Sequence, residues 1–284
     1  MSDFDRRRFL NTSAQVVTAA ALTAAARFSG AAAGDPLSVA VIGPGGMGTN
    51  HLRLLAARKD VRVAYVCDVD ANRAAAAAKL VEQNGGQAKP VKDLRQVLDD
   101  KSVAAVWIAT TDHWHTTAAL LALDAGKHVY VEKPVSHNVR EGRLLVEAAR
   151  RTGRVVQVGM QSRSTPHVRE AIEALRAGEI GEVLVAKAWN SQLRSGIGRQ
   201  QPSQPPSTLD FDLWLGPAPL RPYQSNLLPG VWRWWYDFGA GDMGNDGVHQ
   251  LDITRWALGA DRPTEVYGMG RSSSSTTTSR RPTP

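Results

Sequence analysis

The sequence predicts an α/β protein: an N-terminal Rossmann-like, doubly wound parallel sheet, followed by a truncated α+β open-sheet domain. Three observations predict this. A strand enters a glycine-rich turn at residue 43 and continues into a helix. Short apolar strands alternate with helices from residue 37 to residue 158. A length of 284 residues suits two domains.

Composition excludes several classes of protein. With 43% hydrophobic and 21% charged residues, the chain is not collagen-like, coiled-coil or wholly disordered. The only cysteine, Cys67, excludes an internal disulfide framework and a thiolate zinc cluster. Residues 1–33 and 271–284 contribute +5 of the net charge of +7, so we expect no nucleic-acid partner.

The two ends are expected to lie outside the fold. Residues 1–33 contain Arg6-Arg7-Arg8-Phe9-Leu10, an uncharged alanine-rich stretch and a small-residue site at Ala31-Ala32-Ala33. This layout predicts a twin-arginine signal peptide, and therefore a periplasmic or other extracytoplasmic protein. No later apolar run approaches the roughly 18 residues of a membrane span, so no membrane partner is expected. The Ser/Thr-rich residues 271–284 predict a disordered tail.

The first strand, residues 37–42, leads into Gly43-Pro44-Gly45-Gly46-Met47-Gly48 and a helix. Glycines 43, 45 and 48 match the G-x-G-x-x-G spacing, which provides a tight turn, close backbone approach to a pyrophosphate, and close packing of helix on strand. The helix N-terminus offers free N–H groups to the phosphates. Alone, the pattern is a weak indication of dinucleotide binding.

The second strand, residues 61–67, strengthens the indication of dinucleotide binding because Asp68 follows it directly. An acid there can accept a hydrogen bond from a ribose 2′-hydroxyl and would repel a 2′-phosphate, which favours NAD over NADP. A turn or helix N-cap role for Asp68 is the alternative. Arg73 is close enough in sequence to leave the cofactor preference open.

The alternation continues to residue 158, the end of the expected dinucleotide domain, 34–158. We expect helices at 72–83, 93–98, 116–125 and 140–151, and strands at 103–109, 128–131 and 155–158. Ligands of such sheets bind beyond the carboxyl ends of the strands. This rule selects three segments, Thr110-Thr111-Asp112, Glu132-Lys133-Pro134 and Gly159-Met160-Gln161.

These segments carry a resemblance to a known family. The glycine turn, Ile108 to His115 and Glu132-Lys133-Pro134 resemble the Gfo/Idh/MocA oxidoreductases of sugars and cyclitols. Residues 178–183 and 239–252 resemble that family's second domain, expected here at 159–270 as a partial substrate-binding domain. The resemblance implies a tightly bound NAD, a small carbohydrate or cyclitol substrate, and homo-oligomers among full-length relatives.

The resemblance also implies roles for individual residues. Lys133 and His249 are the expected acid/base groups, with Asn245 as their partner in binding substrate hydroxyls. Arg163 and Asp246 are further candidate substrate contacts. The expected cofactor contacts are Gly43, Gly45, Gly46, Met47, Gly48, Asp68, Thr110, Thr111, Asp112, His115, Glu132, Lys133 and Gln161.

Asn245 departs from the Asp that the family often has at this position. An amide binds hydroxyls but cannot share a proton, so the identity of the proton relay stays open, with Asp246 as a substitute. Asn245 and His249 are four residues apart and are expected on one face of a helix. His113 and His115 lack further ligands, so no metal site is expected.

Residues 232–236, Trp-Arg-Trp-Trp-Tyr, fit a sugar-stacking surface and a core or interface patch equally well. Residues 196–222 predict a long irregular loop. Residues 183–189 and 266–269 are the only clear strands expected in the second domain, too few to close a sheet, which suggests a truncated or frame-shifted reading frame.

The leading hypothesis is therefore an exported NAD(P)-dependent oxidoreductase acting on CH–OH groups of a sugar, sugar derivative or cyclitol. Two alternatives stay open. One is an NAD-dependent, redox-neutral glycoside hydrolase. The other is a non-catalytic fragment that binds dinucleotide.

Overall fold

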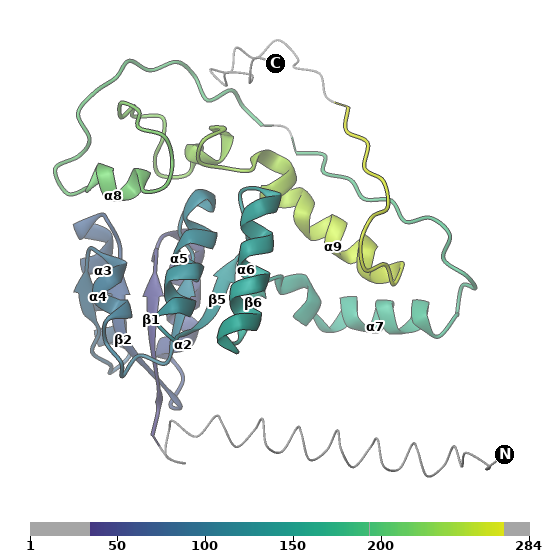
Figure 1. Ribbon diagram of the computed structural model, residues 1–284, viewed down its shortest axis with the longest axis horizontal. Helices are drawn as coiled ribbons and strands as arrows, with labels where there is room; N and C mark the ends of the chain where they lie inside the picture. The colour runs from purple at the N-terminus through teal and green to yellow at the C-terminus, as the bar shows by residue number, and fades with distance from the viewer. Residues whose placement is uncertain (1–34, 193, 270–284) are drawn as a thin grey trace.

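The computed structural model describes residues 35–192 and 194–269. The expected signal peptide at 1–33 and the expected tail at 271–284 lie outside the described residues. Six strands form one parallel sheet in the order β3-β2-β1-β4-β5-β6 (Figure 1). This is the doubly wound order of dinucleotide-binding domains, and the chain reverses its direction of progress between β1 and β4. The predicted fold class is confirmed.

The elements of the first half are closely those expected from the sequence. The strands are β1 (Leu37–Ile42), β2 (Val61–Cys67), β3 (Lys89–Val91), β4 (Ala105–Ile108), β5 (His128–Glu132) and β6 (Val156–Gly159). The helices are α2 (Gly46–Ala56), α3 (Ala71–Gln83), α4 (Leu94–Leu98), α5 (Asp112–Asp124) and α6 (Val139–Thr152). The sequence did not predict β3, and α5 begins four residues earlier than expected.

Two hydrophobic clusters hold the sheet between its helices. Helices α2 and α3 cover one face, where Leu52 and Val81 pack on Val39 and Val41. Helices α4, α5 and α6 cover the other, with Val97, Leu123 and Leu145 against Val106 and Val131. Burial on both faces explains why the central strands read as continuous apolar runs.

After β6 the chain forms a short 3₁₀ turn, η2 (Gln161–Ser164), and α7 (Pro166–Arg176). It then extends to α8 (Phe211–Leu215), η3 (Val231–Trp234), a π-helical turn η4 (Met243–Gly247) and α9 (Val248–Ala257). A third hydrophobic cluster joins α8 to η3 through Trp214, Leu227, Trp232 and Phe238. Residues 208–240 thereby form a cap, which lies over the carboxyl ends of the strands (Figure 1).

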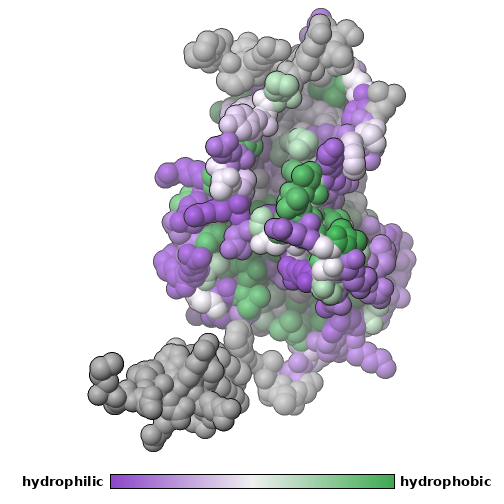
Figure 2. Space-filling view, turned by 90° about the vertical axis from the view of Figure 1, so that its right-hand side faces the viewer, coloured by the Kyte–Doolittle hydropathy of each residue, from purple (hydrophilic) through white to green (hydrophobic). Residues whose placement is uncertain are grey.

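The strands expected at 183–189 and 266–269 are not formed, which corrects that prediction. Both segments are extended and exposed, with Leu184 at 77% and Tyr267 at 87% of full exposure. In the described residues after Gly159, the only β-type pairing is an isolated bridge between Leu209 and Asp70. An apolar segment becomes a strand only where a neighbouring backbone completes its hydrogen bonds. The face carrying α7, α9 and these segments mixes hydrophobic and hydrophilic residues (Figure 2).

The turn between β1 and α2 shows why glycine is required there. Gly43 has φ +78°, in the left-handed region, and a Cβ on it would lie 2.8 Å from the backbone nitrogen of Thr110. A Cβ on Gly48 would lie 2.1 Å from the carbonyl oxygen of Gly43, so α2 can pack this closely only with glycine. A Cβ on Gly46, in contrast, would meet no atom within 4 Å.

The Gly48→Ala variant is therefore expected to lose about 3 kcal/mol of unfolding free energy, because its methyl group forces α2 away from the turn. Gly46→Ala, in the same turn but facing open space, is the matched control and should change it by less than about 1 kcal/mol. Urea unfolding followed by circular dichroism measures both. Equal stability of the two variants would contradict this account of the turn.

Candidate functional site

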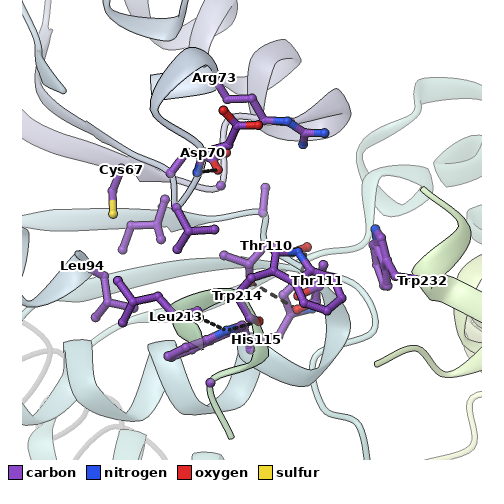
Figure 3. Close-up of a pocket in the computed structure, with 18 of the residues that line it drawn as sticks. Cys67, Asp70, Arg73, Leu94, Thr110, Thr111, His115, Leu213, Trp214 and Trp232 are labelled. Atoms are coloured by element: carbon purple, nitrogen blue, oxygen red, sulfur yellow. Dashed lines mark hydrogen bonds between the residues drawn. The ribbon is translucent and has the colours of Figure 1, made fainter. Parts of the chain in front are cut away.

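A cavity of about 700 Å³ lies between the carboxyl ends of the strands and the cap. It runs from the end of β2, past the glycine turn and the start of α5, to the end of β5. Figure 3 shows Asp70 and Arg73 after β2 and Thr110 and Thr111 before α5. The cap contributes its other wall, which includes Leu213, Trp214 and Trp232. Sites in proteins that enclose a small organic ligand have roughly this size, about 300–1,000 Å³.

The glycine turn forms one wall of the cavity through Gly43, Gly45, Gly46 and Met47. Helix α2 starts there without a side-chain cap and without an acidic residue in its first turn. Its first N–H groups therefore lack an intrahelical partner and present positive charge to the cavity. Open space above Gly46 leaves room for a ligand against the backbone. These features fit the pyrophosphate of a dinucleotide.

Asp68 lies at the end of β2 and lines the cavity with Asp70 and Arg73. Its carboxylate accepts the N–H of Asp70 at 2.9 Å. Burial raises the pKa of Asp68 to about 6, while the Asp70 N–H and the charge of Arg73 act in the opposite direction. Asp68 therefore stabilises the turn after β2 and also lines the cavity. A carboxylate placed here fits the hydroxyls of a ribose.

Residues 110–112 connect β4 to the first turn of α5 and lie next to Gly43 in the glycine turn. Thr110 and Thr111 line the cavity, and so does Asp112, which is 5% exposed. The Asp112 carboxylate accepts the N–H of Ala240 at 3.0 Å and thereby fixes the cap to α5. Burial raises the pKa of Asp112, and the nearby His115 partly offsets this rise.

His115 is 2% exposed and lies between two carbonyl oxygens, those of Pro134 at 2.7 Å and Thr110 at 3.2 Å. His113 similarly lies near the carbonyl oxygens of Phe238 and Trp214, and burial lowers its pKa to about 4. Both histidines therefore connect backbone segments. Within residues 35–192 and 194–269, no three His, Cys, Asp or Glu side chains gather as a metal site.

Lys133 follows β5 at the far end of the cavity. Its ammonium donates to the carbonyl oxygen of Asn245 at 2.6 Å, across 112 positions of sequence. Burial lowers the pKa of Lys133, although the charges of Asp112 and Glu132 favour the protonated form. An amine whose pKa is lowered exchanges a proton more readily near neutral pH than an exposed lysine does.

Asn245 lies in the π-helical turn Met243–Gly247, and His249 lies four residues further on, in the first turn of α9. The Asn245 side chain accepts from Nε of Arg233 at 3.1 Å. His249 keeps a position near Lys133: burial and then the Lys133 charge lower its pKa, and its buried Nδ1 has no hydrogen-bond partner.

Two candidate substrate contacts are engaged elsewhere. Arg163 makes a two-point ion pair with Asp252, at 2.6 and 2.8 Å, and stacks over Trp256. It therefore joins η2 to α9 and does not line the cavity. Asp246 pairs with Arg194, which also pairs with Asp242. The structure thus gives both residues a bracing role.

The sequence reasoning did not identify His51 and Arg233. His51 Nε2 donates to the buried Glu132 carboxylate at 2.6 Å, and Gln161 donates to the same oxygen at 2.6 Å. The other Glu132 oxygen accepts the Lys133 N–H at 3.2 Å. Glu132 and Gln161 were both expected as cofactor contacts. Glu132 lines the cavity and, with Gln161, also forms the support behind Lys133. Nothing local in the sequence links His51 to Glu132.

The aromatic segment 232–236 has buried residues in the cap and an exposed residue at its end. Trp232 and Trp235 are 5% exposed and belong to the cap's hydrophobic cluster. Trp232 also lines the cavity, facing the start of α5 (Figure 3). Tyr236 is 65% exposed and lies outside that cavity.

Two family models match the chain. Residues 37–160 match the NAD-binding Rossmann fold of the Gfo/Idh/MocA oxidoreductase family, and residues 183–269 match the C-terminal alpha/beta domain of the same family. The glycine turn and Asp68 lie within the first match, which establishes NAD as the cofactor class of this domain.

Named relatives agree with these matches. Inositol 2-dehydrogenase 2 of Saccharopolyspora erythraea is 33% identical over 79% of this chain and 55% of its own length. Inositol 2-dehydrogenase of Salmonella paratyphi B is 27% identical over 87% of this chain and 62% of its own. An NAD-binding oxidoreductase from Klebsiella pneumoniae has a similar structure, with a TM-score of 0.55 and 27% identity over 79% of this chain and 54% of that one. The chain therefore spans about half to six-tenths of these relatives.

The raised pKa of Asp68 predicts a pH dependence of NAD binding. The ionised carboxylate accepts two ribose hydroxyls better than the protonated carboxyl, in which one oxygen carries a hydrogen. NAD affinity should therefore rise with pH, by at most about tenfold per pH unit, up to about pH 6 and then level off. Calorimetric titration with NAD between pH 4.5 and 8 measures this. Asp68→Asn keeps the shape without the titration, and a pH step that survives in this variant would contradict the assignment.

Proposed function

This chain belongs to the Gfo/Idh/MocA oxidoreductase family, and from that premise we propose that it transfers hydride between NAD and a CH–OH carbon of a sugar, sugar derivative or cyclitol. One observation carries the proposal. The Lys133 amine, with its pKa lowered by burial, stands at one end of the same cavity that the dinucleotide turn lines. The relatives named inositol 2-dehydrogenase support a polyhydroxylated substrate.

The chain's own residues divide the binding of NAD between them. The turn at Gly43–Gly48 would hold the pyrophosphate, Asp68 the adenosine ribose, and Thr110 with Thr111 the nicotinamide half. Asp68 supports NAD over NADP, because a second negative charge against a buried carboxylate is unfavourable. Bound NAD supplies a hydride acceptor in the oxidative direction and, once reduced, a hydride donor in the other.

Oxidation of a secondary alcohol also requires a group to take the hydroxyl proton. Neutral Lys133 accepts this proton and then, as an ammonium, stabilises the polar carbonyl that remains. In reduction it returns the proton to the new hydroxyl. His249 supports a second proton position, because its lowered pKa keeps it neutral at pH 7. The neutral Asn245 binds and orients without exchanging a proton.

Export through the twin-arginine route belongs to the same proposal, and it rests on residues 1–33 alone. Outside the cytoplasm no pool of NAD recycles the cofactor, which favours a tightly held cofactor regenerated in the site. Within residues 35–192 and 194–269, no helix is long and apolar enough to cross a membrane. The relatives' dehydrogenase names favour this activity over a glycoside hydrolase or an inactive fragment.

Lys133→Met should lower kcat by about 10²- to 10⁴-fold, the usual contribution of a positioned acid or base, while NAD affinity changes little. The assay follows NADH absorbance with myo-inositol and related polyols as substrates. Lys101→Met, an exposed lysine in the turn before β4, is the matched control. Undiminished activity of Lys133→Met would refute the assigned role.

The same lysine predicts a pH profile for oxidation. Because only the neutral amine accepts a proton, activity should rise with pH through the pKa of Lys133. Burial places this pKa below its ordinary value of 10.5, so the rise should be complete at a lower pH than an exposed lysine would give. The pH dependence of kcat/KM measures the position of the rise. A rise centred at or above pH 10.5 would contradict the prediction.

A further inference from the structure

Arg233 lies on the cap, at the same end of the cavity as Lys133. Three uncharged groups hold its guanidinium. Nε donates to the Asn245 side chain at 3.1 Å, one terminal nitrogen donates to the Gly230 carbonyl at 3.2 Å, and the plane stacks over Trp232 at 4.3 Å. These contacts fix the direction of the guanidinium without neutralising its charge.

The neighbouring arginines differ from Arg233 in one respect. Arg163 pairs with Asp252, Arg194 with Asp242 and Asp246, and Arg221 with Asp237. Among the described residues, no carboxylate lies within ion-pair distance of Arg233. A half-buried guanidinium that retains its full charge is unfavourable unless something else compensates it.

The carboxylates of Asp112 and Asp246 favour the charged form of Arg233 from a distance, but neither pairs with it, and burial still lowers its pKa. Asp246 pairs with Arg194, and Asp112 accepts the Ala240 N–H while burial raises its own pKa. The charge of Arg233 disfavours protonation of the neighbouring Lys133 amine, so the two groups lie close together at this end of the cavity. The permanent positive charge at the end where the proposed substrate would bind is therefore that of Arg233.

We propose that Arg233 is a specificity-determining residue that binds an anionic group, a carboxylate or a phosphate, on the polyhydroxylated substrate. The remaining N–H groups of the guanidinium fork match the two oxygens of such a group. The substrate class is thus a sugar acid or sugar phosphate, bound with its anion on Arg233 and its reacting hydroxyl at Lys133. This inference rests on the proposed function, because it concerns the same cavity.

The test compares acids with their neutral counterparts. Full-length protein saturated with NAD is titrated calorimetrically with D-glucuronate, D-galacturonate, D-gluconate and D-glucose 6-phosphate, and with D-glucose, D-galactose and D-glucitol. At least one acid should bind about tenfold tighter or more than its neutral counterpart, the usual gain from a charge-assisted pair. Arg233→Gln should remove this preference and leave neutral ligands and NAD unchanged, and Arg233→Lys should retain part of it.

Arg95 provides the matched control. It lines the opposite end of the cavity and already pairs with Asp93, so Arg95→Gln should preserve the preference for acids. Whether the uronates or the phosphate show the preference distinguishes the two anionic groups. The proposal is overturned if no acid binds better than its neutral counterpart, if the preference survives Arg233→Gln, or if that variant weakens NAD binding instead.

Turnover is measured separately, as NADH formation from each compound. An acid preference without turnover of any compound would refute the proposed function and leave the role of Arg233 standing. Turnover of neutral polyols without an acid preference would support the proposed function and overturn the role of Arg233.

Discussion

The Glu132 carboxylate is the interaction on which the arrangement of this site depends. It is 4% exposed and accepts hydrogen bonds from His51 on α2, Gln161 after β6, and the N–H of Lys133. A carboxylate buried this deeply is tolerated only because donors surround it. The Glu132 carboxylate therefore joins three parts of the site: helix α2, the end of β5 and the segment after β6. Removing any donor leaves charge uncompensated at the point where Lys133 is positioned.

Much of the first half was predictable from sequence, and for a physical reason. Strands β1 and β2 were predicted to the residue because strands buried on both faces are continuous apolar runs. Strand β3 was not predicted from the sequence because it is three residues long, lies at the sheet edge and contains Pro90. Helix α5 begins at Asp112 because its first turn, although polar, is buried against the cap, which the local sequence does not indicate.

The site was predictable only in its strand-end components. The glycine turn, Asp68, Thr110 and Lys133 follow from the rule that ligands bind beyond the carboxyl ends of parallel strands, and all of them line the cavity. The partners of these residues come from distant sequence: Asn245 reaches Lys133 across 112 positions, and His51 reaches Glu132 across 81. Asn245 lies in a π-helical turn and His249 in the α-helix that follows it, an irregularity that the local sequence does not indicate. Residues 183–189 show the related failure: β-propensity without a partner gives an exposed, extended chain.

Desolvation acts in one consistent sense on four titratable groups at or near the cavity. It raises the pKa of Asp68 and Asp112 and lowers that of Lys133 and His249, so each group moves toward its neutral form. Burial lowers the pKa of Arg233 as well, but its guanidinium cannot respond in this way, since a guanidinium remains protonated in proteins. The aspartates, Lys133 and His249 reduce the free-energy cost of their burial by taking up or releasing a proton. Acid–base catalysis uses the same proton exchange. The free-energy cost of burying the Arg233 charge has to be offset by a contact with an opposite charge. The unpaired guanidinium therefore concerns the charge of the substrate, whereas Lys133 concerns the proton transfer.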